Sequence, residues 1–543
     1  MVTPFRHDRP AEATAPSART VARAAGLVGL ATAISRVLGL LREMVLAHYF
    51  GAGRFTDAFY VAYRIPNLLR DLFAEGALSS AFVPTFVAQL KEGGKPRAWR
   101  LANLVINAVA VILGIVTLAI YFGARWFVYL QAAGFAREPD KFELTVQMTR
   151  IMAPFLLFVG LAALMMGMLN ACGSFFLPAM APSAFNVCCI LAGILLRPFM
   201  PGFGLDPIVS MAIGAIIGGA AQFFVQIPAA YREGYRYEPA VDFSDPGLRR
   251  IGRLMLPGII GLSATQINIT VDNQLASMAG DGPVSWLNYA FRLMQLPIGI
   301  FGVAVATVTL TAVSHHAAQK ESDKLAATVS SSLRLAACLT FPATVGLILF
   351  REEIVQLLYE RGEFLPSDTL QTSQVVMFYG LALFAYSAVK ILVPVFYALD
   401  DTRTPVRASV MSVAAKIVVN FLLIVPLGFK GLAVATAAAS WLNFGLLLRK
   451  LHRRLGDRPD RSDLIMYSKI ILASLIMGGL ALLVFRIVRE VFRGQDTLSL
   501  ALTLGTAIAV ALISIVPLLQ LFHVPEATEL SGILRRRLQF KRR

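Results

Sequence analysis

Long runs of apolar residues, separated by short polar connections, recur along the whole of this 543-residue chain. Each run reaches the length of about 20 residues that a helix needs to cross a bilayer. They lie near residues 27–49, 57–90, 100–128, 145–170, 175–198, 207–231, 250–279, 283–316, 325–350, 368–399, 405–427, 430–450, 465–489 and 498–522. We therefore expect an all-α polytopic membrane protein with about fourteen transmembrane helices.

Composition supports a membrane protein. Hydrophobic residues make up 57% of the chain, charged residues make up 15%, and the mean hydropathy is +0.66. A soluble protein of this length would need a more polar surface. Four cysteines, Cys172, Cys188, Cys189 and Cys338, lie in or beside apolar spans. Their positions predict neither a disulfide framework nor a metal site.

Basic residues are concentrated in the polar connections, and this distribution orients the bundle. A net charge of +17 would suit a nucleic-acid partner, but clusters in short connections between spans indicate the positive-inside signal instead. With both termini in the cytoplasm, the connections richest in Lys and Arg all lie inside: 91–100, 231–253, 449–461 and the tail 535–543. We expect no nucleic-acid partner, and we expect cytoplasmic tails at residues 1–24 and 523–543.

The chain also contains a weak internal repeat. VAYRIPNL at 61–68 resembles YAFRLMQL at 289–296, and SFFLPA at 174–179 resembles DTRTPV at 401–406, with offsets of 228 and 227 residues. Six helices per copy give two repeats of the same orientation, an arrangement found in transporters that bind substrate between the halves. The predicted units are an N-lobe at 25–231 (helices 1–6), a C-lobe at 250–450 (helices 7–12) and helices 13–14 at 465–522.

Charged residues inside the first, second and eighth spans are the main candidates for function. A charge at the centre of a bilayer costs roughly 2.5–3.5 kcal/mol on insertion scales. The residues concerned are Arg36, Arg42, Glu43, Asp57, Arg64, Arg70, Asp71, Glu75 and Arg292. Their excess of arginine predicts a polar cavity for an anionic, phosphorylated substrate, because guanidinium groups bind phosphate in a bidentate manner. In the alternative, these charges pair with one another and only tie the helices together.

Prolines and glycines predict interruptions in two of these spans. Pro66 lies in the second span, and Pro297, Gly299 and Gly302 follow Arg292 in the eighth. Irregular backbone at membrane depth is tolerated only beside protein or water. We therefore expect both spans to border the cavity.

The second half carries a separate polar set. Asp272, Asn420 and Ser440 lie within the seventh, eleventh and twelfth spans, and they form a candidate site for a monovalent cation, Na⁺ or H⁺. An ion pair between Asp272 and a lysine, Lys390 or Lys416, is the alternative. No other metal site and no organic cofactor is predicted.

Three segments resemble the MurJ (MviN) family of bacterial lipid II flippases, in the multidrug/oligosaccharidyl-lipid/polysaccharide exporter superfamily. They are SRVLGLLRE at 35–43, FGAGRFTDAFYVAYRIPNLLRDLFAEGALSSAFVPTF at 50–86 and SWLNYAFRLMQLPIGIFGVAVATV at 285–308. The resemblance implies a V-shaped bundle of two lobes around a central cationic cavity. It also implies that helices 13 and 14 form a groove for the polyprenyl tail.

The resemblance assigns roles to individual residues. The family's essential arginines match Arg36, Arg42, Arg70 and Arg292, and a family serine matches Ser285; these are the expected substrate-binding residues. Glu43, Asp57 and Glu75 match cavity or gate acids. The chain departs from some members at Phe291 and Gln295, which weakens a salt-bridge gate on the eighth helix, and at Ile424, which weakens the cation site.

The expected function is transport of lipid II, an undecaprenyl-pyrophosphate-linked disaccharide peptide, to the periplasmic leaflet by alternating access. Such a protein would be a multi-pass monomer of the bacterial inner membrane, in contact with membrane lipids, serving peptidoglycan synthesis, cell wall biogenesis and cell shape. An exporter of another polyprenyl-linked oligosaccharide, or of drugs, is the nearest alternative. A membrane glycosyltransferase, the alternative that is an enzyme, would need a larger catalytic loop than the connections here provide.

The topology can be tested by cysteine labelling in a background without the four native cysteines. Cysteines at Lys95 and Leu455 are expected to react with an impermeant reagent only from the cytoplasm, and one at Glu360 only from the periplasm, because of the charge bias of the connections. Labelling of position 455 from the periplasm would reverse the orientation.

Overall fold

Helices make up nearly all of the secondary structure in this computed structural model. It describes the chain except for residues 1–17, 73–77, 243, 457–460, 493–495 and 528–543, and the described part contains no strand. The predicted all-α fold is thus confirmed.

The helices follow the predicted spans closely. In the first half they are α1 (Ala18–Phe50), α2 (Arg54–Arg70), α3 (Ser79–Ala132), η2 (Ala133–Arg137), α4 (Pro139–Met152), α5 (Phe155–Ala171), α6 (Phe176–Leu195), η3 (Arg197–Phe203), α7 (Val209–Phe224) and α8 (Ile227–Arg232). In the second half they are α9 (Pro246–Ser277), α10 (Pro283–Pro297), η4 (Ile298–Gly302), α11 (Val303–Ala318), α12 (Ser322–Leu349), α13 (Arg351–Tyr359), α14 (Pro366–Ala398), α15 (Arg403–Leu427), α16 (Lys430–Leu455), α17 (Arg461–Val491) and α18 (Thr497–Leu521).

Eleven helical segments of the described chain are long and apolar enough to cross a membrane. One of them, Ala81–Arg137, changes direction at Gly94, whose φ of 68° and ψ of −173° are not helical. The residues before Gly94 continue the span that α2 begins, and the residues after it form the next span. The helices α1 and α9, with 33 and 32 residues, are also long enough to cross a membrane. Together these segments account for the fourteen predicted crossings.

The two ends of the chain differ from the expected tails. The helix α1 begins at Ala18, inside the segment 1–24, because alanine and arginine favour a helix even in its polar surroundings. After α18, Val524 and Ala527 are buried against the second half of the bundle. The remaining predicted tail residues lie outside the described part of the chain.

Both spans are interrupted, at matching places in the two repeats, although the second span is interrupted at residues 71–72 and not at Pro66. The helix α2 continues through Pro66, and residues 71–72 after it are π-helical. The helix α10 ends at Pro297 and continues as the π-helical turn η4. Adding the repeat offset of 228 residues to 71–72 leads into η4, which supports the predicted repeat. Such π-helical turns widen a helix locally and often lie at functional sites.

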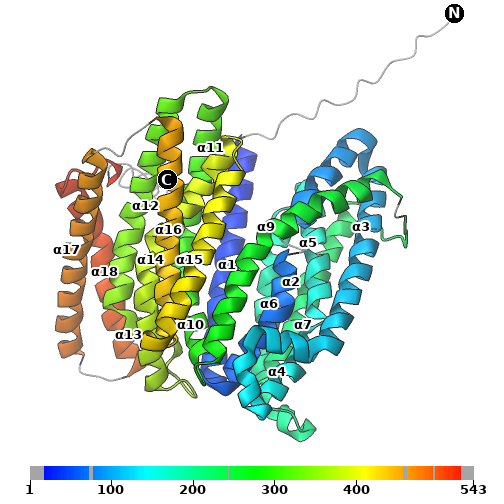
Figure 1. Cartoon of the computed structure of the whole chain (residues 1–543), viewed down its shortest axis with the longest axis horizontal. Coiled ribbons are helices and arrows are strands. Elements are labelled where there is room, and N and C mark those ends of the chain that lie inside the picture. Colours follow the sequence, from blue (N-terminus) through cyan, green and yellow to red (C-terminus); the bar gives the residue numbers. More distant parts are fainter. Residues whose placement is uncertain (1–17, 73–77, 243, 457–460, 493–495, 528–543) are drawn as a thin grey trace, which may run out of the picture.

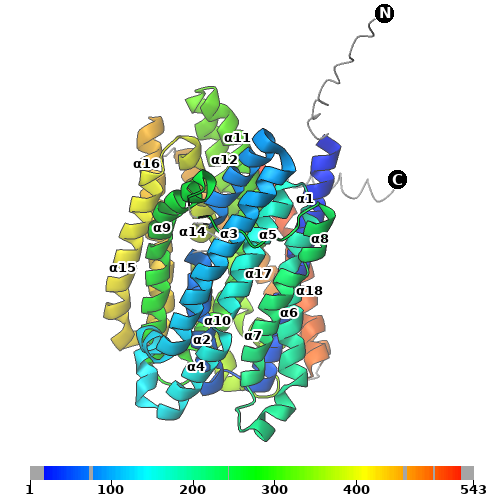
Figure 2. The ribbon, with the colours of Figure 1, turned by 90° about the vertical axis from the view of Figure 1, so that its right-hand side faces the viewer.

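Two groups of helices form a V (Figure 1). The helices α3, α5, α6 and α7 lie in one arm, and α11, α12, α14, α16, α17 and α18 lie in the other, with α9 running obliquely beside α3 (Figures 1 and 2). The start of α1 and the end of α18 lie at the same end of the bundle (Figure 1). The arms meet at the opposite end, where α2, α4 and α10 begin.

Backbone meets backbone where the arms join. The Glu363 N–H donates a 3.0 Å hydrogen bond to the carbonyl oxygen of His48. Gly51 and Gly362 flank this bond with φ of 65° and 62°, in the left-handed region that favours glycine. A Cβ atom at Gly51 would collide with the Glu363 carbonyl, and one at Gly362 with the His48 carbonyl. Both glycines are therefore needed for the close approach.

Replacement of Gly362 by alanine should destabilise this junction. A positive φ costs alanine roughly 1–2 kcal/mol, and the clash with His48 adds roughly 1–3 kcal/mol. Gly204→Ala is the matched control, because Gly204 has a φ of 69° but a Cβ atom at this position would meet no other atom within 4 Å. Thermal unfolding of the purified proteins should give a lower midpoint for Gly362→Ala than for Gly204→Ala; equal midpoints would argue against the contact.

Candidate functional site

Glu43 on α1 is a buried acid that holds two arginines. Its side chain is 2% exposed, and its Oε1 lies 2.6 Å from Arg42 Nη2 and 3.2 Å from Arg292 Nη2. The Tyr60 hydroxyl donates a 2.6 Å hydrogen bond to Oε2. Glu43 therefore links α1, α2 and α10, and it orients the guanidinium groups of Arg42 and Arg292.

Asp71, directly after α2, holds a second pair of arginines. Its carboxylate lies 2.9 Å from Arg70 Nη2 and 3.4 Å from Arg64 Nη1. Gln266 on α9 accepts a hydrogen bond from Arg64 and donates one of 3.4 Å to Asp71. Sequence reasoning missed Gln266, although a glutamine inside an apolar span is itself an unusual polar residue. This network joins the second span to α9.

Arg36 on α1 lies against the interrupted eighth span. Its Nη1 is 3.5 Å from the carbonyl oxygen of Gln295, and a Cβ atom at Gly299 would overlap its guanidinium group. No carboxylate in the described part of the chain forms an ion pair with Arg36. Among the described residues, Arg36 therefore has a backbone carbonyl oxygen as its hydrogen-bond partner.

We define an arginine cluster of five residues: Arg36, Arg42, Arg64, Arg70 and Arg292. Tyr63 on α2 lies near enough to Arg42, Arg70 and Arg292 to interact electrostatically with all three. The cluster contacts two carboxylates within the described residues, Glu43 and Asp71. Among the described residues, mutual pairing therefore accounts for four of the arginines and not for Arg36, whose partner is a backbone carbonyl. Glu75, a further predicted acid, lies outside the described residues.

Asp57 lies apart from the arginine cluster, at the junction of the arms. Its fully buried carboxylate accepts hydrogen bonds from Gly282 N at 2.8 Å, from Ser285 N at 2.8 Å and from Ser285 Oγ at 2.6 Å. These donors form the start of α10, whose dipole favours a negative charge there. Ser285, expected at the substrate, is buried against Asp57 in this conformation, and its predicted substrate contact stays a prediction.

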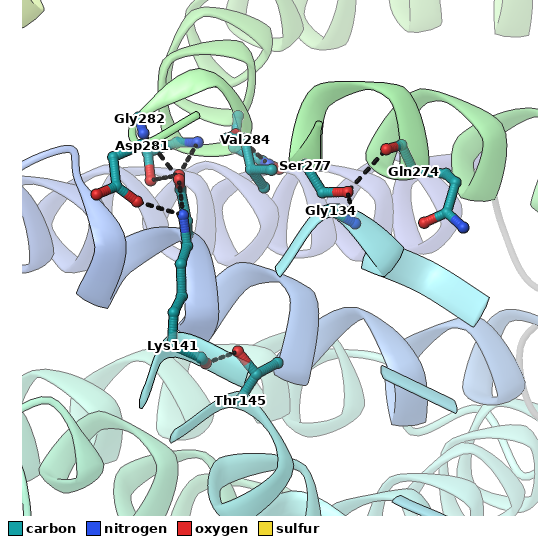
Figure 3. Close-up of polar contacts among 11 residues, drawn as sticks. Gly134, Lys141, Thr145, Gln274, Ser277, Asp281, Gly282 and Val284 are labelled. Carbon is teal, nitrogen blue, oxygen red and sulfur yellow. Dashed lines mark hydrogen bonds and ion pairs between the residues drawn. The ribbon is translucent and has the colours of Figure 1, made fainter. Parts of the chain in front are cut away.

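Lys141 on α4 completes this junction, as Figure 3 shows. Its side chain is 1% exposed, and its ammonium nitrogen lies 3.1 Å from Asp57 Oδ2 and 2.5 Å from Asp281 Oδ1. The ring of Phe135 lies 4.2 Å from the same nitrogen. We call Asp57, Lys141, Asp281, Gly282 and Ser285 the gate cluster. Sequence reasoning missed Lys141 and Asp281, because each lies at the edge of an apolar span, where charges are ordinary.

Of the candidate cation residues, the structure brings two together. Asp272 Oδ2 lies 2.5 Å from Lys416 Nζ, and Asn420 Nδ2 donates a 2.9 Å hydrogen bond to Asp272 Oδ1. The Ser440 hydroxyl donates to the carbonyl oxygen of Thr436 in its own helix. The ion pair left open as an alternative is thus the arrangement found, with Lys416 as the lysine.

Comparison with known proteins gives consistent results. The family model described as "Lipid II flippase MurJ" matches residues 46–503. A probable lipid II flippase MurJ of Vibrio cholerae is 37% identical over 462 residues, with 83% of this chain and 87% of the relative covered. The lipid II flippase MurJ of Burkholderia cenocepacia is 34% identical over 453 residues, with the same coverage.

Solved structures agree with the fold. A lipid II flippase MurJ in an inward closed conformation has a TM-score of 0.75 and 28% identity, with 91% of this chain and 99% of that chain covered. A multidrug resistance MATE family transporter in an inward-facing conformation has a TM-score of 0.64 and 13% identity, with 78% and 94% covered, and this likeness concerns the fold alone. The family match and the curated relatives, named as transporters rather than enzymes, place this chain in the lipid II flippase MurJ family.

Proposed function

We propose that this protein moves lipid II from the cytoplasmic to the periplasmic leaflet of the bacterial inner membrane by alternating access. The observation that carries the proposal is the arginine cluster of five half-buried arginines, four of which contact the carboxylates of Glu43 and Asp71. The family supplies the identity of the substrate, and the cluster supplies a means to bind its pyrophosphate.

The cluster is suited to a pyrophosphate group. A guanidinium group can form two parallel hydrogen bonds to phosphate oxygens while it keeps its charge. Arg292 is 38% exposed although it contacts Glu43, so part of its donor set is free to meet a ligand. Arg36 and Arg42 come from α1, and Arg292 comes from α10. A headgroup bound among them would therefore contact both repeats at once.

The gate cluster offers the second requirement of alternating access, a junction that can open. Separation of the arms would remove Gly282, Ser285 and Asp281 from Asp57 and Lys141. Because Lys141 and Asp57 both lie in the first repeat and are 3.1 Å apart, each keeps a counter-charge after separation. Opening would therefore not leave a lone buried charge, which would cost several kcal/mol.

The orientation follows from the loop charges. With both termini in the cytoplasm, the gate cluster lies on the periplasmic side and closes that side in this conformation. The same assignment makes the protein inward-facing. From the family resemblance, we propose that the lipid tail of the substrate lies against α17 and α18. A monomer suffices for this arrangement, since both repeats are in one chain.

Arg42→Ala should abolish transport. It removes a charge-assisted contact worth about 1.5–3 kcal/mol, or roughly 10- to 100-fold in headgroup affinity. Arg42→Lys should be impaired as well, because lysine lacks the guanidinium fork. Arg125→Ala is the control, since Arg125 is 61% exposed and pairs with Glu143 away from the cluster.

The measurement is made in cells that carry each variant as the sole copy, with membrane insertion verified by immunoblot. Arg42→Ala cells should stop growing, and lipid II should accumulate in the cytoplasmic leaflet. Normal growth would contradict the role of the cluster. Accumulation of a different polyprenyl-linked oligosaccharide would identify that lipid as the substrate instead.

Gly299→Ala tests whether the position of Arg36 matters. An alanine side chain would displace the guanidinium group, the flexible end of Arg36, and should leave the helix intact. We expect lipid II export about tenfold lower, the effect of one lost contact of about 1.5 kcal/mol. Gly346→Ala is the matched control, because no atom lies within 4 Å of the added carbon. Equal export rates for the two variants would show that Arg36 does not depend on Gly299.

A further inference from the structure

A polar pocket lies within the second repeat, away from the arginine and gate clusters. It is formed by α9, α14, α15 and α16, and its lining includes Asn268, Lys416, Ser440 and Asn443. Such a group of polar side chains inside an apolar bundle is costly unless its members serve one another or a ligand. The contacts of Lys416 indicate whether these side chains bind one another or a ligand.

We infer that the Lys416 ammonium group takes the place of an exchangeable monovalent cation in this pocket, so that the protein carries its own cation there. The inference concerns the ion coupling of the transport proposed above. It rests on the contacts of Asp272, and its test needs no lipid substrate.

Both carboxylate oxygens of Asp272 are already used. Oδ2 lies 2.5 Å from Lys416 Nζ, and Oδ1 accepts a 2.9 Å hydrogen bond from Asn420. Lys416 and Asn420 are four residues apart on α15 and therefore share one face of that helix. The Lys416 side chain is 5% exposed and the Asp272 side chain is 23% exposed, so the ammonium group is buried and the carboxylate is partly buried. The pair fixes α15 to α9.

The surroundings of this pair are rich in acceptors. The side-chain carbonyl oxygens of Asn268, Asn420 and Asn443 are buried and have no hydrogen-bond partner among the described residues. Oxygen ligands of this kind, with one carboxylate, are what a hard cation prefers. The set therefore has the chemistry of a cation site, and the ammonium group of Lys416 is the cation that occupies its carboxylate.

A free ion cannot readily replace a tethered one here. Entry of Na⁺ at Asp272 would displace Lys416 and leave its ammonium group buried without a counter-charge, which is strongly unfavourable. The next helical turn offers no further ligand, since Ile424 follows Asn420. The site therefore does not exchange ions with solvent, and transport should not draw on a Na⁺ gradient through it.

Removal of the tethered charge should convert the pocket into an exchangeable site. The experiment compares thermal unfolding of the purified full chain in NaCl and in choline chloride at equal ionic strength. The wild-type midpoint should be the same in both salts. Lys416→Met keeps the length of the side chain without its charge, and its midpoint should rise by at least about 2 °C in NaCl, because an ion that binds only the folded state stabilises it.

A double variant gives the control. Lys416→Met with Asp272→Asn removes both charges, and it should lose the response to Na⁺. Lys416→Gln is the second variant to use if Lys416→Met does not fold. The inference would be overturned if Na⁺ raised the unfolding midpoint of the wild-type protein and Asp272→Asn abolished that rise. It would also be overturned if single Lys416 variants folded but did not respond to Na⁺. A wrong lipid substrate would leave all of these results unchanged, so the two proposals fail separately.

Discussion

A buried charge needs a counter-charge or polar partners, and the interior of this bundle is organised by that requirement. Three of the acids in the described part of the bundle illustrate this, and each is compensated in a different way. Glu43 is held by Arg42 and Arg292, Asp57 by Lys141 and the start of α10, and Asp272 by Lys416 and Asn420. Because an uncompensated charge would be costly at membrane depth, these contacts restrict which helices can be neighbours.

The three centres differ in how they would respond to movement of the arms. Glu43 and Asp57 each join the first repeat to α10, so their contacts must change if the arms separate. Asp272 and Lys416 lie on α9 and α15, both within the second repeat, and their pair can persist. The contacts of Glu43 and Asp57 are therefore suited to substrate binding and gating. The contact of Asp272 is suited to holding the second repeat together.

The helix α9 has a special place between the repeats. By sequence it opens the second repeat, yet it lies beside α3 and, through Gln266, joins the Arg64 and Asp71 network of the first. Hydrogen bonds from Ala133 N to Gln274 Oε1 and from Gly134 N to Ser277 Oγ also join it to the first repeat, whereas Asp272 faces α15. Any motion that alters the angle between the arms must therefore rearrange one side of α9.

The sequence by itself determined the helices, because apolar runs of bilayer length have few other folds available. It also placed arginines inside the spans and predicted the interruption after Arg292. For Asp272 it left two partners open, a cation and a lysine. Only the tertiary structure chose Lys416, set Ser285 against Asp57, and brought in Gln266 and Lys141. Helical periodicity gives the direction of a side chain around its own axis, but pairing depends on which helices are neighbours and on their relative depth and rotation. Those quantities arise from packing across hundreds of residues, which no local pattern records.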